Sequence, residues 1–164
     1  MSRPNDKRWE TMNKSEMPLS QVIEDYANDL KILRRSPKTI SFYLRNLNMF
    51  LKWLKRHGYR GVLGDISLLT AKKYILYLED DHRKYQDHPN MPQRDECLSP
   101  YSIQGHVRTL KSFSSWCYRE EYLSEAVLAR LKLPKVPKLI IKILTDDEVR
   151  IILSIPSDRY RQKR

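Results

Sequence analysis

The amino-acid sequence predicts an all-α fold of four or five helices. Only 4 of its 164 residues are glycine, which argues against a turn-rich β protein. Apolar residues recur every three or four positions over long segments, the spacing of one face of an α-helix. The pairs Ser36-Pro37 and Ser99-Pro100 are typical of helix starts, because serine caps free N–H groups and proline fits the first turn.

Four long helices are expected in chain order, over about residues 19–33, 37–57, 70–83 and 100–120. A short helical piece is expected around residues 124–131. Each long helix carries an apolar stripe that should face a common core. The inward residues are expected to be Val22, Tyr26, Leu30 and Leu33, then Ile40, Leu44, Leu47, Leu51 and Leu54, then Ile75 and Leu78, and finally Ile103, Val107, Leu110, Ser114 and Cys117.

The chain is expected to divide into four parts. Residues 1–17 are a polar arm, residues 18–133 one helical domain, residues 134–144 a linker, and residues 145–164 the start of a second domain. Two prolines in Leu-Pro-Lys-Val-Pro-Lys stiffen the linker, and residues 139–144 are apolar and β-leaning. Thr145-Asp146-Asp147-Glu148 forms a capping box that opens a further helix. Since nothing after that helix could pack on it, we expect the second domain to be truncated.

Charge predicts a polyanionic partner. The formal net charge is +11 at pH 7, which favours nucleic acid first and acidic membranes second. No stretch approaches the roughly 18 apolar residues of a membrane span. The charged start of the chain lacks the apolar segment of a secretion signal. We therefore expect a cytoplasmic, nucleoid-associated protein without a membrane partner, in which Cys97 and Cys117 are reduced thiols.

The basic residues are concentrated in segments that contain no acid. Residues 31–64 hold nine lysines and arginines and no aspartate or glutamate, and residues 101–119 and 127–144 are also free of acids. This distribution predicts one strongly basic side of the molecule. A solvated surface that happens to be basic is the alternative interpretation.

Two helices are expected to present basic outer faces. At about 100° per residue, the second gathers Lys38, Phe42, Arg45, Met49, Lys52, Trp53 and Arg56 opposite its apolar stripe. Cations with aromatics between them suit a helix on a phosphate backbone or in a major groove. The apolar members of this face could instead pack on another part of the protein.

The outer face of the fourth helix repeats the pattern with Tyr101, Gln104, Gly105, Arg108, Ser112, Ser115 and Arg119, with Lys111 at its margin. Gln104 and Arg108 can make bidentate contacts to base edges. A glycine inside a helix costs about 1 kcal/mol relative to alanine, so Gly105 indicates the close approach of either a nucleic-acid backbone or a neighbouring helix. The predicted DNA-binding residues are Ser36, Lys38, Thr39, Phe42, Arg45, Lys52, Tyr101, Ser102, Gln104, Gly105, Arg108, Lys111, Ser112, Lys135 and Lys138.

Several motifs resemble one family. They are Ser36-Pro37-Lys38-Thr39-Ile40, Tyr43-Leu44-Arg45-Asn46-Leu47, Phe50-Leu51-Lys52-Trp53-Leu54, Leu98-Ser99 with Ser102-Ile103, Leu110-Lys111-Ser112-Phe113 with Trp116, the proline-lysine linker, and Leu144-Thr145-Asp146-Asp147-Glu148-Val149. Their order and spacing are similar to the amino-terminal core-binding domain of tyrosine recombinases, which include phage integrases.

The resemblance implies a SAM-like four-helix domain that holds one face of duplex DNA while a carboxyl-terminal catalytic domain closes on the other. In such enzymes a tyrosine attacks a phosphodiester, assisted by arginine, lysine and histidine, and further recombinase protomers act on the same DNA. The apolar, glycine-containing segment that carries the first catalytic arginine of the family has no match here. Tyr160 matches no nucleophile motif, so no catalytic residue is assigned. The loop at residues 80–98 is longer than the family pattern; a partner contact, an insertion and simple slack all remain open.

Other chemistries receive little support. The spacing of His82, His88 and Cys97 fits no common zinc module, so no metal is expected. There is no glycine-rich phosphate loop, and no cofactor is expected. Two rival functions remain: a stand-alone helical DNA-binding regulator, and a helical protein-interaction module that docks another helix through Phe42, Met49 and Trp53.

Overall fold

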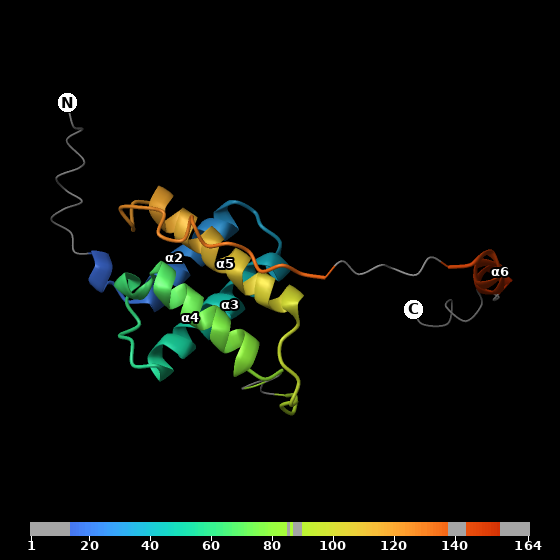
Figure 1. Ribbon diagram of the computed structural model, residues 1–164. Helices are drawn as coiled ribbons and strands as arrows, with labels where there is room; N and C mark the ends of the chain where they lie inside the picture. Colours follow the sequence, from blue (N-terminus) through green and yellow to red (C-terminus); the bar gives the residue numbers. More distant parts are fainter. Residues whose placement is uncertain (1–13, 85, 87–89, 138–143, 155–164) are drawn as a thin grey trace.

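The computed structural model describes residues 14–84, 86, 90–137 and 144–154 (Figure 1). Apart from two isolated β-bridges, all regular secondary structure in these residues is helical, which confirms the predicted all-α class. The α-helices are α2 (Leu19–Ile32), α3 (Pro37–Arg56), α4 (Leu68–Asp80), α5 (Pro100–Arg119) and α6 (Asp146–Ser154), with short 3-10 helices η1 (Lys14–Glu16) and η2 (Leu63–Asp65).

Serine side chains start three of the helices. Ser36 and Ser99 cap α3 and α5 by accepting the backbone N–H three residues later, each at 3.2 Å. Both predicted serine-proline starts are therefore confirmed. Ser67 caps α4 in the same way at 3.1 Å, so this helix begins at Leu68 rather than Thr70 and ends at Asp80 rather than Arg83. The cap is local chemistry that overrides a start chosen from periodicity alone.

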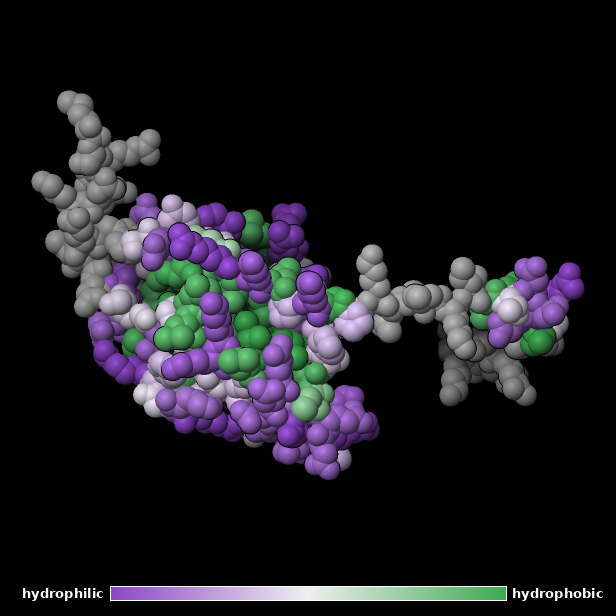
Figure 2. Space-filling model, in the orientation of Figure 1, coloured by the Kyte–Doolittle hydropathy of each residue, from purple (hydrophilic) through white to green (hydrophobic). Residues whose placement is uncertain are grey.

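The core lies where α2, α4 and α5 close around α3. Its centre is aromatic: the ring of Tyr26 on α2 lies 5.3 Å from Phe113 and 5.1 Å from Trp116 on α5. On the other side of α3, Phe50 lies 5.0 Å from Tyr74 of α4. In Figure 2, apolar residues show between hydrophilic side chains in the middle of the face formed by α4 and α5.

The buried face of α3 differs from the predicted stripe. Trp53, expected on the outer face, is only 4% exposed, and its ring lies 5.3 Å from Tyr74. Ile40 and Leu44, expected inside, are only half-buried. The reason is tertiary: neighbours pack on more than one side of α3, so its carboxyl-terminal half buries a band wider than a single stripe.

A buried polar pair joins α3 to α5. The side-chain amide of Asn46 donates to the Thr109 hydroxyl at 3.0 Å, and that hydroxyl donates to the Gly105 carbonyl at 3.0 Å. Asn46 is 4% exposed and Thr109 is fully buried. Because buried polar groups are costly without partners, this chain of hydrogen bonds fixes the register of the two helices.

The short helical piece expected around residues 124–131 is not a helix. These residues form bends and turns, closed by backbone bonds such as Leu131 N–H to the Leu128 carbonyl at 3.1 Å. Leu128 and Leu131 are buried against the core. The apolar residues of this segment therefore do face the core, but turns rather than a helix place them there.

The capping box predicted before α6 is present. The Thr145 hydroxyl accepts the Glu148 N–H at 3.3 Å, and the Glu148 carboxylate accepts the Thr145 N–H at 2.8 Å. None of the residues of α6 is buried. At the other end, Lys14, from the stretch expected as a polar arm, donates to the Glu121 carbonyl at 2.6 Å.

The remaining expectations for residues 1–13, His88, Lys138, residues 139–143 and Tyr160 lie outside the described residues. Among the described helices, none is long and apolar enough to cross a membrane.

Replacing Asn46 tests the polar link between α3 and α5. Asn46→Ala leaves the buried Thr109 hydroxyl without its donor, and we expect the free energy of unfolding to fall by about 2 kcal/mol. Asn48→Ala, an exposed asparagine on the same helix, should change it by less than about 0.5 kcal/mol. Urea denaturation of both variants measures the difference; equal effects would contradict a stabilising role for the buried pair.

Candidate nucleic-acid interface

One face of α3 is exposed and basic. Lys38, Phe42, Arg45, Lys52 and Arg56 are all exposed, as the helical spacing predicted. The Arg45 guanidinium lies over the Phe42 ring, 5.8 Å from its centroid, which holds the cation beside an aromatic surface. At the start of the helix Ser36 caps the backbone, and its hydroxyl lies 2.8 Å from that of Thr39. The face therefore offers several cations along one line.

A hollow of about 600 Å³ adjoins this face. It lies between α3, the segment that connects α4 to α5, and the first turns of α5. No carboxylate belongs to the described residues that line it. The cationic and imidazole side chains that line it are Arg45, Lys52, Arg56, His82, Lys84 and His106. Cations from α3 and from the α4–α5 connection therefore meet in one recess, to which α5 adds the imidazole of His106.

Sequence reasoning did not identify the contribution of His82, Lys84 and His106 to this recess. The two histidines are buried, and no local pattern distinguishes them from core residues. The Nδ1 atoms of His82 and His106 lie 3.3 Å from the hydroxyls of Tyr77 and Tyr74, respectively. Burial, followed by the nearby His82 and Arg45, lowers the pKa of His106 to about 4.

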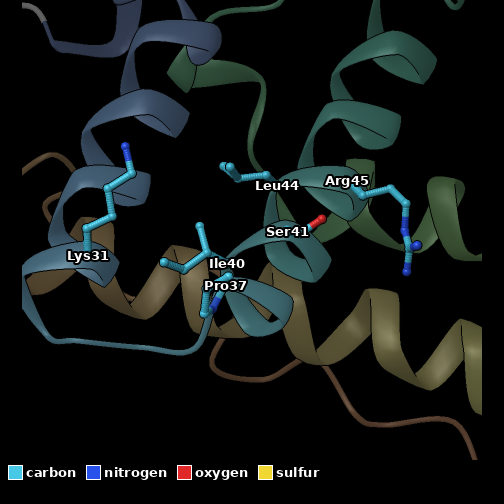
Figure 3. A pocket seen from close by; sticks show the side chains of 6 residues that line it. All are labelled: Lys31, Pro37, Ile40, Ser41, Leu44 and Arg45. Atoms are coloured by element: carbon cyan, nitrogen blue, oxygen red, sulfur yellow. The ribbon is translucent and has the colours of Figure 1, made fainter. Parts of the chain in front are cut away.

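A second, shallower hollow of about 530 Å³ lies where α2 meets the start of α3. Figure 3 shows Lys31 on one helix and Pro37, Ile40, Ser41, Leu44 and Arg45 on the other around it. Its lining is mostly apolar. Arg45 lines both hollows, so it stands on the ridge between them.

Gly105 is explained by helix packing. A Cβ atom at this position would lie 3.1 Å from the Cζ atom of Phe42. Of the two explanations left open by the sequence, the structure therefore contains the close approach of a neighbouring helix. Phe42, predicted to contact DNA, also covers this glycine.

The linker lies along the outer face of α5. We call residues 133–137 the strap; in Figure 1 this segment, in orange, crosses α5. Gln104 donates to the Pro134 carbonyl at 3.0 Å, and Tyr101 donates to the Pro137 carbonyl. Lys111 donates to the Leu131 carbonyl at 2.6 Å, just before the strap. These three side chains were predicted to contact DNA, and here they hold the chain's own backbone.

The other predicted residues on α5 are divided between inside and outside. Ser112 is half-buried, and its hydroxyl lies 3.1 Å from that of Tyr26. Ser102 and Arg108 are exposed, and Lys135 is exposed on the strap. Among the predicted residues, the exposed cations therefore gather at α3, Arg108 and Lys135.

Comparisons with known proteins point to one family. Tyrosine recombinase XerD of Oceanobacillus iheyensis is 27% identical over 138 residues, which cover 84% of this chain and 41% of that protein. Tyrosine recombinase XerC of Chlamydia caviae is 25% identical, over 80% of this chain and 42% of that protein. Tyrosine recombinase XerA of Thermococcus kodakarensis is 29% identical over 145 residues, 88% of this chain and 41% of that protein.

The chain thus spans about two fifths of the length of these relatives. No family model and no solved structure matches it.

The lowered pKa of His106 predicts a pH-dependent stability. Because its pKa in the folded protein lies below the ordinary 6.5, folding favours the neutral ring, and this contribution is lost as pH falls from about 6.5 towards about 4. Between about pH 7 and about pH 4.5, wild type should lose about 2.5 kcal/mol more stability than His106→Gln. Equal losses in urea denaturation would contradict this.

The strap should loosen when its donor is removed. In Gln104→Ala the Pro134 carbonyl loses its hydrogen bond, so we expect lower heteronuclear NOE values at the Lys135 and Val136 amides. Arg108→Ala, an exposed residue one turn further along α5, is the control and should leave these values unchanged. If neither substitution changes them, Gln104 does not hold the strap.

Proposed function

We propose that this chain, which belongs to the tyrosine recombinase family, holds duplex DNA for site-specific recombination. The observation that carries the proposal is the basic face of α3 beside a recess whose lining, in the part of the chain that the structure describes, has no carboxylate. The phosphate backbone dominates the affinity of proteins for DNA, and it selects for clustered lysine and arginine. A net charge of +11 adds a long-range attraction to any polyanion.

The amino-terminal half of α3 is proposed as the principal contact. Lys38 and Arg45 are exposed and two turns apart on one face, which is a spacing that can reach successive phosphates along one groove. Thr39 and Ser102 supply hydroxyls nearby, and Arg108 supplies a fork suited to guanine or phosphate. Lys135 extends this cationic surface onto the strap.

The side chains that hold the strap and the residue before it are not proposed as principal DNA contacts. Tyr101, Gln104 and Lys111 already donate to backbone carbonyls, so contact with DNA would require those bonds to be exchanged. We propose that they position the linker beside the DNA. Strand cleavage is proposed for a carboxyl-terminal domain of the kind that the family resemblance implies, with further protomers on the same DNA.

Charge reversal on α3 tests the proposal. Lys38→Glu combined with Arg45→Glu should weaken binding to a labelled duplex by at least about 100-fold at low salt, because two charge-assisted contacts become repulsive. The matched control is Lys72→Glu with Lys73→Glu, two exposed lysines on α4 with the same change in net charge. Fluorescence anisotropy over a range of salt concentrations gives both the affinity and its salt dependence.

Similar losses in the two double variants would mean that the attraction depends only on total charge. Absence of binding by the wild type at low salt would contradict the proposed function itself.

A further inference from the structure

The hollow beside α3 has a folded second wall. After α4, Arg83 forms a β-bridge with Cys97. The Lys84 N–H donates to the Glu96 carbonyl at 2.8 Å, and their side chains form an ion pair at 3.1 Å. The described residues of this connection are therefore organised, and they bring Lys84 and Gln86 to the same hollow as Arg45 and Lys52.

The lining of the hollow selects for an anion. Two arginines and one lysine from α3 meet one lysine from the α4–α5 connection there. No carboxylate belongs to the described residues that line the hollow, although Lys84 is paired with Glu96 beside it. The positive electrostatic potential of these side chains is stronger in a recess than on a flat surface, since the walls of a recess exclude water from the space between the charges. An anionic group small enough to enter would contact cations from two sides at once.

Trp53 supplies an independent observation. It lines the hollow and is 4% exposed, yet its indole Nε1 is buried without a hydrogen-bond partner among the described residues. Buried N–H groups are rarely left without an acceptor, because the lost hydrogen bond costs free energy. Met49 and Lys52, which line the same hollow, have long side chains that can move aside for an incoming acceptor. The unused donor therefore points to an acceptor that the described residues do not provide.

We infer that this hollow is a recessed phosphate subsite, in which a backbone phosphodiester of DNA accepts from the Trp53 indole N–H between Lys52 and Lys84. This inference rests on the proposed function and adds two contact residues to it, Trp53 and Lys84. DNA is favoured over an acidic peptide because Arg45 and Lys52 belong both to this hollow and to the exposed face of α3. One continuous backbone could therefore follow the face and place one phosphate in the recess.

The indole resonance of Trp53 reports directly on the subsite. The chain has three tryptophans, Trp9, Trp53 and Trp116, so uniform ¹⁵N labelling gives three indole signals beside the backbone amides, and Trp53→Phe identifies the relevant one. We would titrate the full chain with a short duplex, with inorganic phosphate, and with an oligoglutamate peptide. A shift of the Trp53 indole signal with the duplex is the expected result.

The other outcomes distinguish the failure of this inference from failure of the proposed function. If amides at residues 38–45 shift with the duplex while the Trp53 indole does not, the subsite is overturned and DNA binding stands. If nothing shifts, the proposed function fails. An indole shift with phosphate or oligoglutamate but not with the duplex would overturn the assignment to DNA. A shift with both duplex and phosphate supports the subsite and identifies phosphate itself as sufficient.

Salt dependence separates the two new residues. Trp53→Phe removes a neutral donor and keeps an aromatic ring, so binding to the duplex should weaken by about tenfold with no change in salt slope. Lys84→Gln removes a cation and should also lower the salt slope by about 0.9.

Two controls accompany these variants. Trp116→Phe changes a tryptophan whose indole already donates to Asp29 at 3.1 Å, and Lys73→Gln removes an exposed cation on α4. Unchanged affinity in folded Trp53→Phe and Lys84→Gln, or equal losses in the controls, would overturn the subsite.

Discussion

The close approach of α3 to α5 is the constraint on which the rest of the structure depends. Gly105 allows the Phe42 ring to lie where a side chain would otherwise stand, and one turn further along both helices Asn46 and Thr109 are hydrogen-bonded. These two contacts bring the helices together and fix their register. A bulkier residue at position 105 would therefore disturb the buried polar pair as well as the surface. The basic face and the first turns of α5 owe their mutual position to this contact.

Part of the fold could be predicted because it depends on neighbours in sequence. The starts of α3 and α5 follow from serine caps and proline, and the capping box at Thr145 needs only residues within one turn. The buried face of α3 could not be predicted in this way. Trp53 is covered by Tyr74, which lies on another helix, so its burial depends on how the helices assemble. The turns that bury Leu128 and Leu131 likewise depend on packing against the core, which no local helix signal in the sequence reveals.

In the candidate site, too, the features set by local sequence could be predicted and those set by tertiary packing could not. The exposed cations of α3 could be read from helical spacing, because they need no partner to be exposed. The recess could not, since Lys84 and His106 reach it from segments far apart in sequence. The strap was also hidden, because its acceptors are backbone carbonyls, which every residue possesses. Side chains such as Gln104 that look suited to reading bases can equally recognise the chain's own backbone.

The strap also shortens the distance that α6 can reach from the helical domain. If the chain were held only as far as Leu131, which is buried in the core, the 14 residues 132–145 could reach about 49 Å when fully extended. With the chain held as far as Pro137, the eight residues 138–145 reach at most about 28 Å. By holding the strap, Tyr101 and Gln104 thus limit how far α6 can lie from the helical domain.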